Sequence, residues 1–135
     1  MKGAAFLDTN LLVYAALRPD ARSDRARALL AEGGVVSVQV LDEFADVARR
    51  KLRRPWPEVR QALADVRALC RPPLPVTLAA HEAALGIADR LGYRFYDSLV
   101  IASALEAGCA TLLSEDLRDG QVVEGRLTIR DPFRT

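Results

Sequence analysis

Residues 4–17 read AAFLDTNLLVYAAL, and this stretch carries two secondary-structure signals in direct succession. Residues 4–7 form a short apolar run, which predicts a strand. The polar turn Asp8-Thr9-Asn10 follows, and residues 11–17 then form a second apolar segment with the pattern of a helix. The chain is therefore expected to begin with a strand, a polar turn and a helix.

The rest of the chain alternates in the same way. Helices are expected over residues 21–32, 38–52, 58–70, 78–91 and 98–107. Brief strands are expected over residues 35–36, 74–76, 110–113 and 126–129. Ser37 and Thr77 are suited to cap the helices that follow them, and Gly92 and Gly108 are suited to end helices. The 98–107 helix is apolar nearly all round, which predicts that it is buried.

This alternation predicts the fold class. Strands that are separated by helices need crossover connections, so the sheet should be mainly parallel, with helices on both faces. We therefore expect an α/β fold, a three-layer α/β/α sandwich with a mainly parallel central sheet. Ligands of such sheets collect beyond the carboxyl ends of the strands.

Length and composition indicate an ordinary globular domain. The chain has 135 residues, of which 50% are hydrophobic and 27% charged, and we expect one domain over residues 1–135. Its two cysteines form no CxxC motif and are expected to be reduced. A leader segment is not recognisable, and no apolar run approaches the roughly 20 residues that span a bilayer, so we expect a cytoplasmic protein.

The net charge of +1 comes from 19 basic and 18 acidic residues, and the basic residues are nearly all arginine. If several acids gather in one pocket, the rest of the surface must be more basic than the total suggests, as a nucleic-acid enzyme needs. The basic run RRKLRR, residues 49–54, has two explanations. It could bind an RNA backbone, or it could simply complement the dipole at the end of its helix.

Two aspartates lie at the boundaries of predicted elements. Asp8 comes directly after the first strand, and Asp97 stands at the start of the 98–107 helix. Each is well placed to be a helix N-cap, a structural role that needs no further function. Neither residue alone separates a structural role from a functional one.

Glu43 is more informative because it interrupts an apolar helical face. It shares a stripe with Val40 and Val47, at spacings of three and four residues. A carboxylate on this stripe is costly unless it reaches the rim of the sheet or meets a cation or a donor. Asp42 and Asp46, by contrast, are expected to be solvated neighbours.

Asp116 follows the 110–113 strand, with Ser114 two residues before it, and a surface turn is the alternative explanation. Acids thus stand at the ends of two strands, on an inward helical stripe and at the start of a buried helix. A hard divalent cation explains all four positions together, because Mg²⁺ and Mn²⁺ take oxygen ligands and relieve carboxylate repulsion.

Four motifs occur along the chain in a fixed order: FLDTNLLVY (residues 6–14), SVQVLDEF (37–44), YDSLVIASA (96–104) and LSEDL (113–117). They resemble the motifs of the PIN-domain ribonucleases, especially the VapC-like toxins of bacterial and archaeal toxin–antitoxin pairs. The resemblance covers essentially the whole chain.

The resemblance implies a catalytic and metal-binding set made of Asp8, Glu43, Asp97 and Asp116. Asp8 and Asp97 would be the principal ligands of Mg²⁺ or Mn²⁺, and the other two acids would be further or water-mediated ligands. The last segment matches least well, because Glu115 stands close enough to replace Asp116. Asp119 is a second substitute for the same position.

The hydroxyl and amide positions of the family are also occupied. Thr9 and Asn10 follow the first acid, and Ser114 precedes the last one. The resemblance implies hydrolysis of RNA to products with a 5′ phosphate and a 3′ hydroxyl. It also implies a homodimer and a small antitoxin protein that covers the pocket.

Other functions fit less well. A phosphatase of the Asp-x-Asp kind needs an acid where Asn10 stands, and a phosphoacceptor receiver domain needs a late lysine, whereas no lysine follows Lys51. His81 stands alone, and neither cysteine has a candidate base nearby in the sequence, so no covalent nucleophile is expected. The remaining alternative is a catalytically inactive module of the same fold that binds a nucleic acid or a partner.

Overall fold

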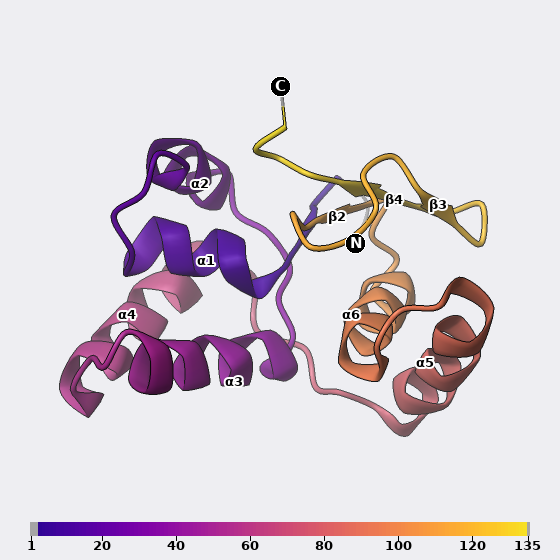
Figure 1. The fold of residues 1–135 in the computed structure, drawn as a ribbon, viewed down its shortest axis with the longest axis horizontal. Helices are drawn as coiled ribbons and strands as arrows, with labels where there is room; N and C mark the ends of the chain where they lie inside the picture. Colours follow the sequence, from indigo (N-terminus) through magenta and orange to yellow (C-terminus); the bar gives the residue numbers. More distant parts are fainter. Residues whose placement is uncertain (1–2, 135) are drawn as a thin grey trace.

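Helices pack on both sides of a central sheet in the computed structural model, which describes residues 3–134 (Figure 1). The larger helical layer contains α1 (Thr9–Ala16), α2 (Ser23–Ala31), α3 (Val38–Asp46) and α4 (Trp56–Leu69). The smaller layer is the pair α5 (Leu78–Leu91) and α6 (Phe95–Glu106). The predicted α/β/α class is confirmed.

The sheet contains β1 (Phe6–Leu7), β2 (Thr111–Leu113), β3 (Val122–Val123) and β4 (Leu127–Arg130), in the order β1-β2-β4-β3. β1, β2 and β4 are parallel, and β3 is antiparallel to β4. The mainly parallel sheet is therefore confirmed. The sequence analysis missed β3, because its two residues lie between the turn glycines Gly120 and Gly125.

Two of the predicted strands are single bridges beyond β1. Val35 pairs with Phe6, and Leu74 pairs with Ser37, both in the parallel sense. The segment at Val35 cannot lengthen, because Ser37 already caps α3. The segment at Leu74 cannot lengthen toward Pro72 and Pro73, because prolines lack the N–H groups that a strand ladder requires. The predictions of strands over residues 35–36 and 74–76 were therefore wrong in extent.

Side-chain caps begin the helices α1, α3 and α5. Thr77 and Gly92 bound α5 as predicted, with Gly92 in the left-handed region. The predicted helix over residues 38–52 is instead α3 followed by a π-helical turn, η1 (Val47–Lys51), in which the Leu52 N–H donates to the Val47 carbonyl at 3.0 Å. The helix predicted over residues 58–70 begins earlier, at Trp56, because a proline fits the first turn of a helix.

The hydrophobic core runs between the sheet and the helices. Phe6, Leu112 and Ile129 come from three neighbouring strands and are fully buried. All side chains from Ser98 to Leu105 of α6 are buried, which confirms the prediction of a buried helix. Among the described residues, no helix has the length and apolar character that crossing a membrane requires.

Gly34 gives a test of how tightly β1 packs. A Cβ added at Gly34 would lie 2.7 Å from side-chain atoms of buried Leu7 and 3.1 Å from the Ala5 carbonyl oxygen. That oxygen accepts the Val35 N–H at 2.9 Å and cannot easily withdraw. Gly34→Ala should therefore lower the free energy of unfolding by about 1–3 kcal/mol in urea denaturation.

The matched control for this prediction is Gly86→Ala in the middle of α5. A Cβ at Gly86 meets only the end of the Arg90 side chain at 3.4 Å, and alanine favours a helix. Gly86→Ala should leave stability unchanged or raise it by up to about 1 kcal/mol. Equal effects of the two substitutions would contradict the packing argument.

Candidate active site

Asp8 lies where β1 ends and α1 begins. Its Oδ1 accepts the Thr9 N–H at 2.8 Å, so Asp8 is the N-cap of α1. Its Oδ2 accepts the Ser114 hydroxyl at 2.8 Å, directly after β2. The Asp8 N–H also donates to the Leu113 carbonyl at 3.1 Å, which continues the β1–β2 pairing. The carboxyl ends of these two strands therefore meet at Asp8.

Glu43 reaches the same place from α3. Its Oε2 accepts the Thr9 hydroxyl at 2.9 Å, and its Oε1 accepts the Gln39 amide at 3.1 Å. Buried Gln39 also donates to the Tyr96 carbonyl at 3.0 Å, so it connects α3 to the start of α6. Glu43 thus meets two donors, which is one of the ways in which a carboxylate on this helical stripe becomes less costly.

Asp97 lies in the first turn of α6 and is not its N-cap. The helix begins at Phe95, and the N-cap position is held by Arg94, which makes no side-chain capping bond. The prediction that the helix starts after Asp97 was therefore wrong, and the Asp97 carboxylate is not used for capping. It forms a long ion pair with Arg94 at 3.4 Å.

Asp116 and Glu115 point to different surroundings. Asp116 accepts the Asn10 amide at 2.6 Å, next to Asp8. Glu115 instead accepts the Tyr14 hydroxyl and pairs with Arg22 at 2.9 Å, and the Arg22 guanidinium lies over the Tyr14 ring. Glu115 is thus engaged in a structural network.

Asp119, the other substitute for Asp116, is also engaged elsewhere. It accepts the Asp131 N–H at 2.9 Å at the end of β4. Of these three acids, only Asp116 lines the same pocket as Asp8.

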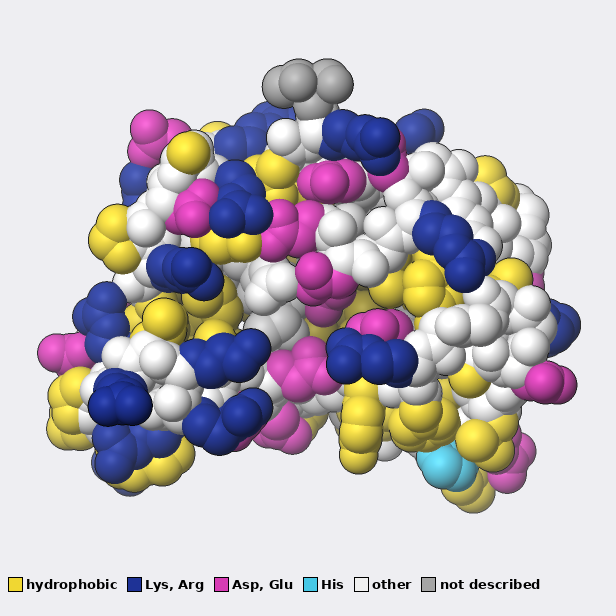
Figure 2. All heavy atoms as spheres, in the orientation of Figure 1, with side chains coloured by type: hydrophobic (Ala, Val, Ile, Leu, Met, Phe, Trp, Pro, Cys, Tyr) yellow, Lys and Arg dark blue, Asp and Glu magenta, His cyan; other side chains and the backbone are white. Residues whose placement is uncertain are grey.

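The four predicted acids Asp8, Glu43, Asp97 and Asp116 line one open pocket of about 410 Å³. Acidic side chains fill the hollow between the two helical layers (Figure 2). Asp42 and Asp46 are exposed, as predicted, but they also stand on the rim of this pocket, which the sequence did not indicate. The rim is completed by Thr9, Asn10, Val47, Arg50, Arg94 and Tyr96.

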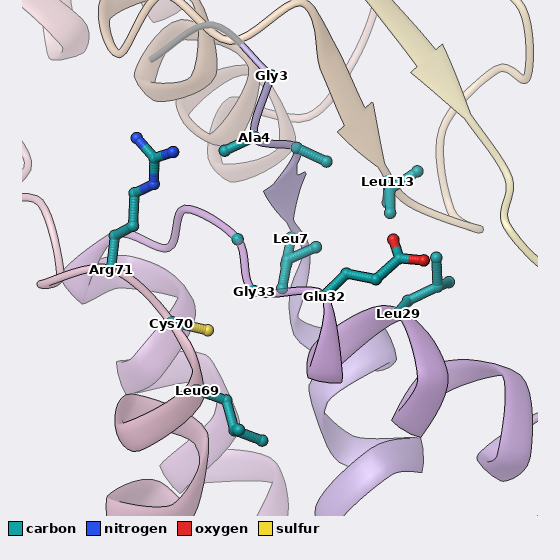
Figure 3. A pocket seen from close by; sticks show the side chains of 12 residues that line it. Gly3, Ala4, Leu7, Leu29, Glu32, Gly33, Leu69, Cys70, Arg71 and Leu113 are labelled. Atoms are coloured by element: carbon teal, nitrogen blue, oxygen red, sulfur yellow. The ribbon is translucent and has the colours of Figure 1, made fainter.

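A second pocket lies at the other end of β1 and has a different character (Figure 3). Glycines and the apolar side chains of Leu7, Leu29 and Leu69 form most of its wall, with Glu32 and Arg71 as its charged groups. It contains none of the four predicted acids, which all line the pocket beside Asp8.

Burial and neighbouring charges together perturb the Asp8 carboxyl group. Burial is the main reason that the pKa of Asp8 rises from 3.8 to about 6. The charges of Glu43 and Asp116 act in the same direction, and the hydrogen bonds from Ser114 and Thr9 oppose them. Partial burial and the charges of Glu115 and Asp97 also raise the pKa of Asp116.

The pocket has the donors of a hard cation but no closed ligand group. Among residues 3–134, no Lys or Arg forms an ion pair with Asp8, Glu43 or Asp116. Within the same part of the chain, no three His, Cys, Asp or Glu side chains are arranged so that they could hold a metal ion together. The chemistry of the donor set, carboxylates with hydroxyl and amide neighbours, fits Mg²⁺ or Mn²⁺.

Nucleophilic side chains lie elsewhere. Burial raises the pKa of the Cys70 thiol to about 11 and also raises that of Cys109, so neither is a thiolate near neutral pH. His81 packs edge-on against Phe95 and does not line the pocket. The expectation that these three residues take no part in the site fits their positions.

Gln39, Arg94 and Tyr96 lie at or beside the pocket, and the sequence did not single them out. Gln39 stands four residues before Glu43 on the same helix, and this spacing was an available signal. Tyr96 joins the rim only because α6 starts earlier than predicted, and no local pattern indicates that.

The raised pKa of Asp8 predicts how stability depends on pH. The folded protein binds the Asp8 proton more tightly than the unfolded chain does, so the stability from this proton is present below the ordinary pKa of 3.8 and is lost as the pH rises toward 6. Asp8→Asn, which keeps the cap, avoids this loss. In EDTA, it should be more stable than the wild type near pH 8, by up to about 3 kcal/mol.

Urea denaturation of both proteins near pH 8 and below about pH 4 measures this difference. The advantage of Asp8→Asn should shrink at the lower pH. An advantage that is absent at the higher pH, or that does not change with pH, would contradict the burial of a charged Asp8.

Comparisons with known proteins place the chain in a family. A family model described as PIN domain matches residues 5–122. VapC20 of Mycobacterium tuberculosis, a toxin that cleaves the sarcin-ricin loop, has a TM-score of 0.68 at 24% identity over 84% of this chain and 92% of that one. A toxin–antitoxin complex from Klebsiella pneumoniae has a TM-score of 0.73 at 13% identity over 98% of this chain and 100% of that one. No curated protein matches the sequence.

At these identities the two solved structures show a shared fold, and they confirm the expected PIN-like architecture. The family model covers most of the sequence, including all four expected motifs, which hold Asp8, Glu43, Asp97 and Asp116. The chain therefore belongs to the PIN domain family.

Proposed function

We propose that the chain is a metal-dependent ribonuclease that hydrolyses RNA phosphodiester bonds, and that it is the toxin of a toxin–antitoxin pair. One observation carries this proposal. Four carboxylates from four separate segments line one pocket at the carboxyl ends of the strands, in a chain of the PIN domain family. The likeness to VapC20, a toxin that cleaves the sarcin-ricin loop, supports RNA as the substrate class.

In this proposal, Asp8 and Asp97 are the principal ligands of Mg²⁺ or Mn²⁺, and Glu43 and Asp116 are further ligands. Carboxylate oxygens with hydroxyl and amide neighbours are the donors that Mg²⁺ and Mn²⁺ take. The bound ion would supply a deprotonated water and stabilise the departing 3′ oxygen.

The neighbours of the acids hold these carboxylates in place. Ser114 fixes Asp8, Thr9 fixes Glu43 and Asn10 fixes Asp116, each through a side-chain hydrogen bond. Oriented carboxylates favour in-line attack of water on phosphorus, which leaves a 5′ phosphate and a 3′ hydroxyl. These three neighbours are positioning residues, because each acts through an acid.

The alternative to an enzyme is a catalytically inactive module of the same fold that binds a nucleic acid or a partner. The complete set of four acids favours the enzyme, because a binding surface for RNA gains nothing from uncompensated negative charge. An assay of RNA cleavage separates the two functions.

The proposal extends to partners. The Klebsiella pneumoniae neighbour is a toxin–antitoxin complex, which supports a small antitoxin as the partner of this chain. An arginine of the antitoxin could pair with Asp8 or Asp97 in place of metal and substrate. A cytoplasmic homodimer is the assembly that the family resemblance supports.

Cleavage and metal binding test the proposed site. Asp8→Asn and Asp97→Asn keep the size of each side chain and remove a charged ligand, so each should lower RNA cleavage about a hundredfold or more while the protein stays folded. Millimolar Mn²⁺ or Mg²⁺ should raise the Tm of the wild type and raise that of either variant much less. Undiminished cleavage in EDTA would contradict the metal mechanism.

Asp24→Asn is the matched control for Asp97→Asn. Asp24 also lies in the first turn of a helix and pairs with an arginine three residues away, but it does not line the pocket. The Asp24→Asn variant should retain RNA cleavage. Asp116→Asn should lose cleavage, whereas Glu115→Gln should mainly lower the Tm because it disturbs the contacts to Tyr14 and Arg22.

A growth experiment tests the toxin assignment. Expression of the wild-type chain alone should arrest a bacterial host, because an unrestrained ribonuclease destroys cellular RNA. Expression of Asp8→Asn should not arrest growth. Co-expression of the wild-type chain with the antitoxin encoded by a neighbouring gene should restore growth through a stable complex. A harmless wild type at high expression would remove the toxin assignment and leave the nuclease proposal standing.

A further inference from the structure

Arginines stand on both sides of the acid pocket. Arg50, on η1, lines one side, and Arg94, at the start of α6, lines the other. Both side chains extend into solvent, with 68% and 88% of their surface exposed. Figure 2 shows further Lys and Arg side chains gathered over the end of α3 and the start of α4, beside the acidic hollow. An anionic strand that crosses the pocket would therefore meet a cation before and after the acids.

Both arginines have partners that they can exchange. Arg50 pairs with exposed Asp46 at 2.9 Å, and Arg94 pairs with Asp97 at 3.4 Å. Exposed ion pairs are weak, whereas a guanidinium binds phosphate with two parallel hydrogen bonds. A metal ion at Asp97 would further reduce the hold of that acid on Arg94, because the ion competes for the carboxylate.

Arg54 differs from these two residues. It donates to the Leu17 carbonyl at 2.7 Å and pairs with Glu58, so it ties η1 to the body of the protein. The basic run at residues 49–54 therefore combines a structural arginine with arginines that face solvent. The contact of Arg54 with the Leu17 carbonyl at the end of α1 is a third role, which the sequence did not indicate.

Tyr96 offers an aromatic surface beside Arg94. Its side chain lines the pocket, and the residue is 65% exposed. Its backbone carbonyl is held by buried Gln39, and its ring meets the Phe95 ring edge-on at 5.5 Å, so the exposed ring has a defined position. Unpaired bases stack on exposed aromatic rings of this kind.

We propose that Arg50 and Arg94 bind phosphates of a single-stranded RNA on opposite sides of the acid pocket, and that Tyr96 stacks one of its bases. This inference rests on the proposed function and adds the path of the substrate strand. The arginines offset the repulsion between the acids and the RNA backbone, and the stacked base positions the neighbouring phosphodiester bond at the acids.

Binding in EDTA tests the strand path without cleavage. Fluorescence anisotropy of a labelled single-stranded RNA of about 12 nucleotides is measured over a range of salt concentrations. Each phosphate contact contributes about 0.7 to the slope of log affinity against log salt for a single strand. Arg50→Ala and Arg94→Ala should each weaken binding and reduce the slope by about 0.7.

Arg126→Ala is the matched control for the arginines. Arg126 is an exposed arginine that pairs with Glu124 at 3.0 Å in the turn between β3 and β4, away from the pocket. The Arg126→Ala variant should change neither the affinity for RNA nor the salt slope, apart from the small effect of losing one positive charge. A slope that falls equally in all three variants, or a wild type that binds no RNA in EDTA, would overturn the inference.

Substitutions of Tyr96 test stacking. Tyr96→Leu keeps an apolar side chain without a ring and should weaken binding about tenfold, whereas Tyr96→Phe should bind like the wild type. Equal binding by the leucine and phenylalanine variants would overturn the stacking role. RNA cleavage in Mn²⁺ is measured in parallel. If the protein cleaves RNA but binds it equally well without the two arginines, only this inference is overturned. If binding depends on the arginines but no RNA is cleaved, only the proposed function is overturned.

Discussion

The Asp8 carboxylate connects three parts of the molecule through its two oxygen atoms. One oxygen holds the first N–H of α1, and the other holds the hydroxyl that follows β2. The same residue extends the β1–β2 ladder through its own N–H. The end of the sheet, the start of the first helix and the floor of the pocket therefore depend on one side chain. Its position requires burial near other acids, so its ionised form costs the folded chain stability despite these two hydrogen bonds.

The molecule separates its charges although their sum is close to zero. The net charge is +1, yet the acids collect in the hollow and arginines occupy its two sides. An acidic pocket attracts a divalent cation and repels a polyanion, whereas the surrounding arginines do the opposite. A substrate that carries phosphates and a cofactor that carries positive charge can both be accommodated by this arrangement. The average composition gives no indication of it.

The regular parts of the fold were predictable because they depend on local patterns. α5 was predicted to the residue, since Thr77 and Gly92 mark its ends and few other residues can replace them there. β3 and the start of α6 were not, because β3 exists only through pairing with β4, and Phe95 joins its helix without a capping side chain. The four acids could be singled out by type and position. The spacing of Gln39 to Glu43 was an available signal, whereas Arg94 and Tyr96 could not be found, because their relevance arises from the approach of α3 to α6.

The π-helical turn η1 makes the end of α3 tolerant of a change in chain length. A π-turn holds one residue more than an α-turn, so deletion of a residue within Val47–Lys51 can restore regular α-helical hydrogen bonding. Side chains beyond such a deletion would keep their direction, because the deletion removes the extra residue that the π-turn accommodates. In an evolving lineage, a single codon lost here would leave the end of the helix in register with the core. The same loss within α6 would turn buried side chains out of the core. Length variation among relatives should therefore accumulate beside the pocket at η1 and be purged from α6.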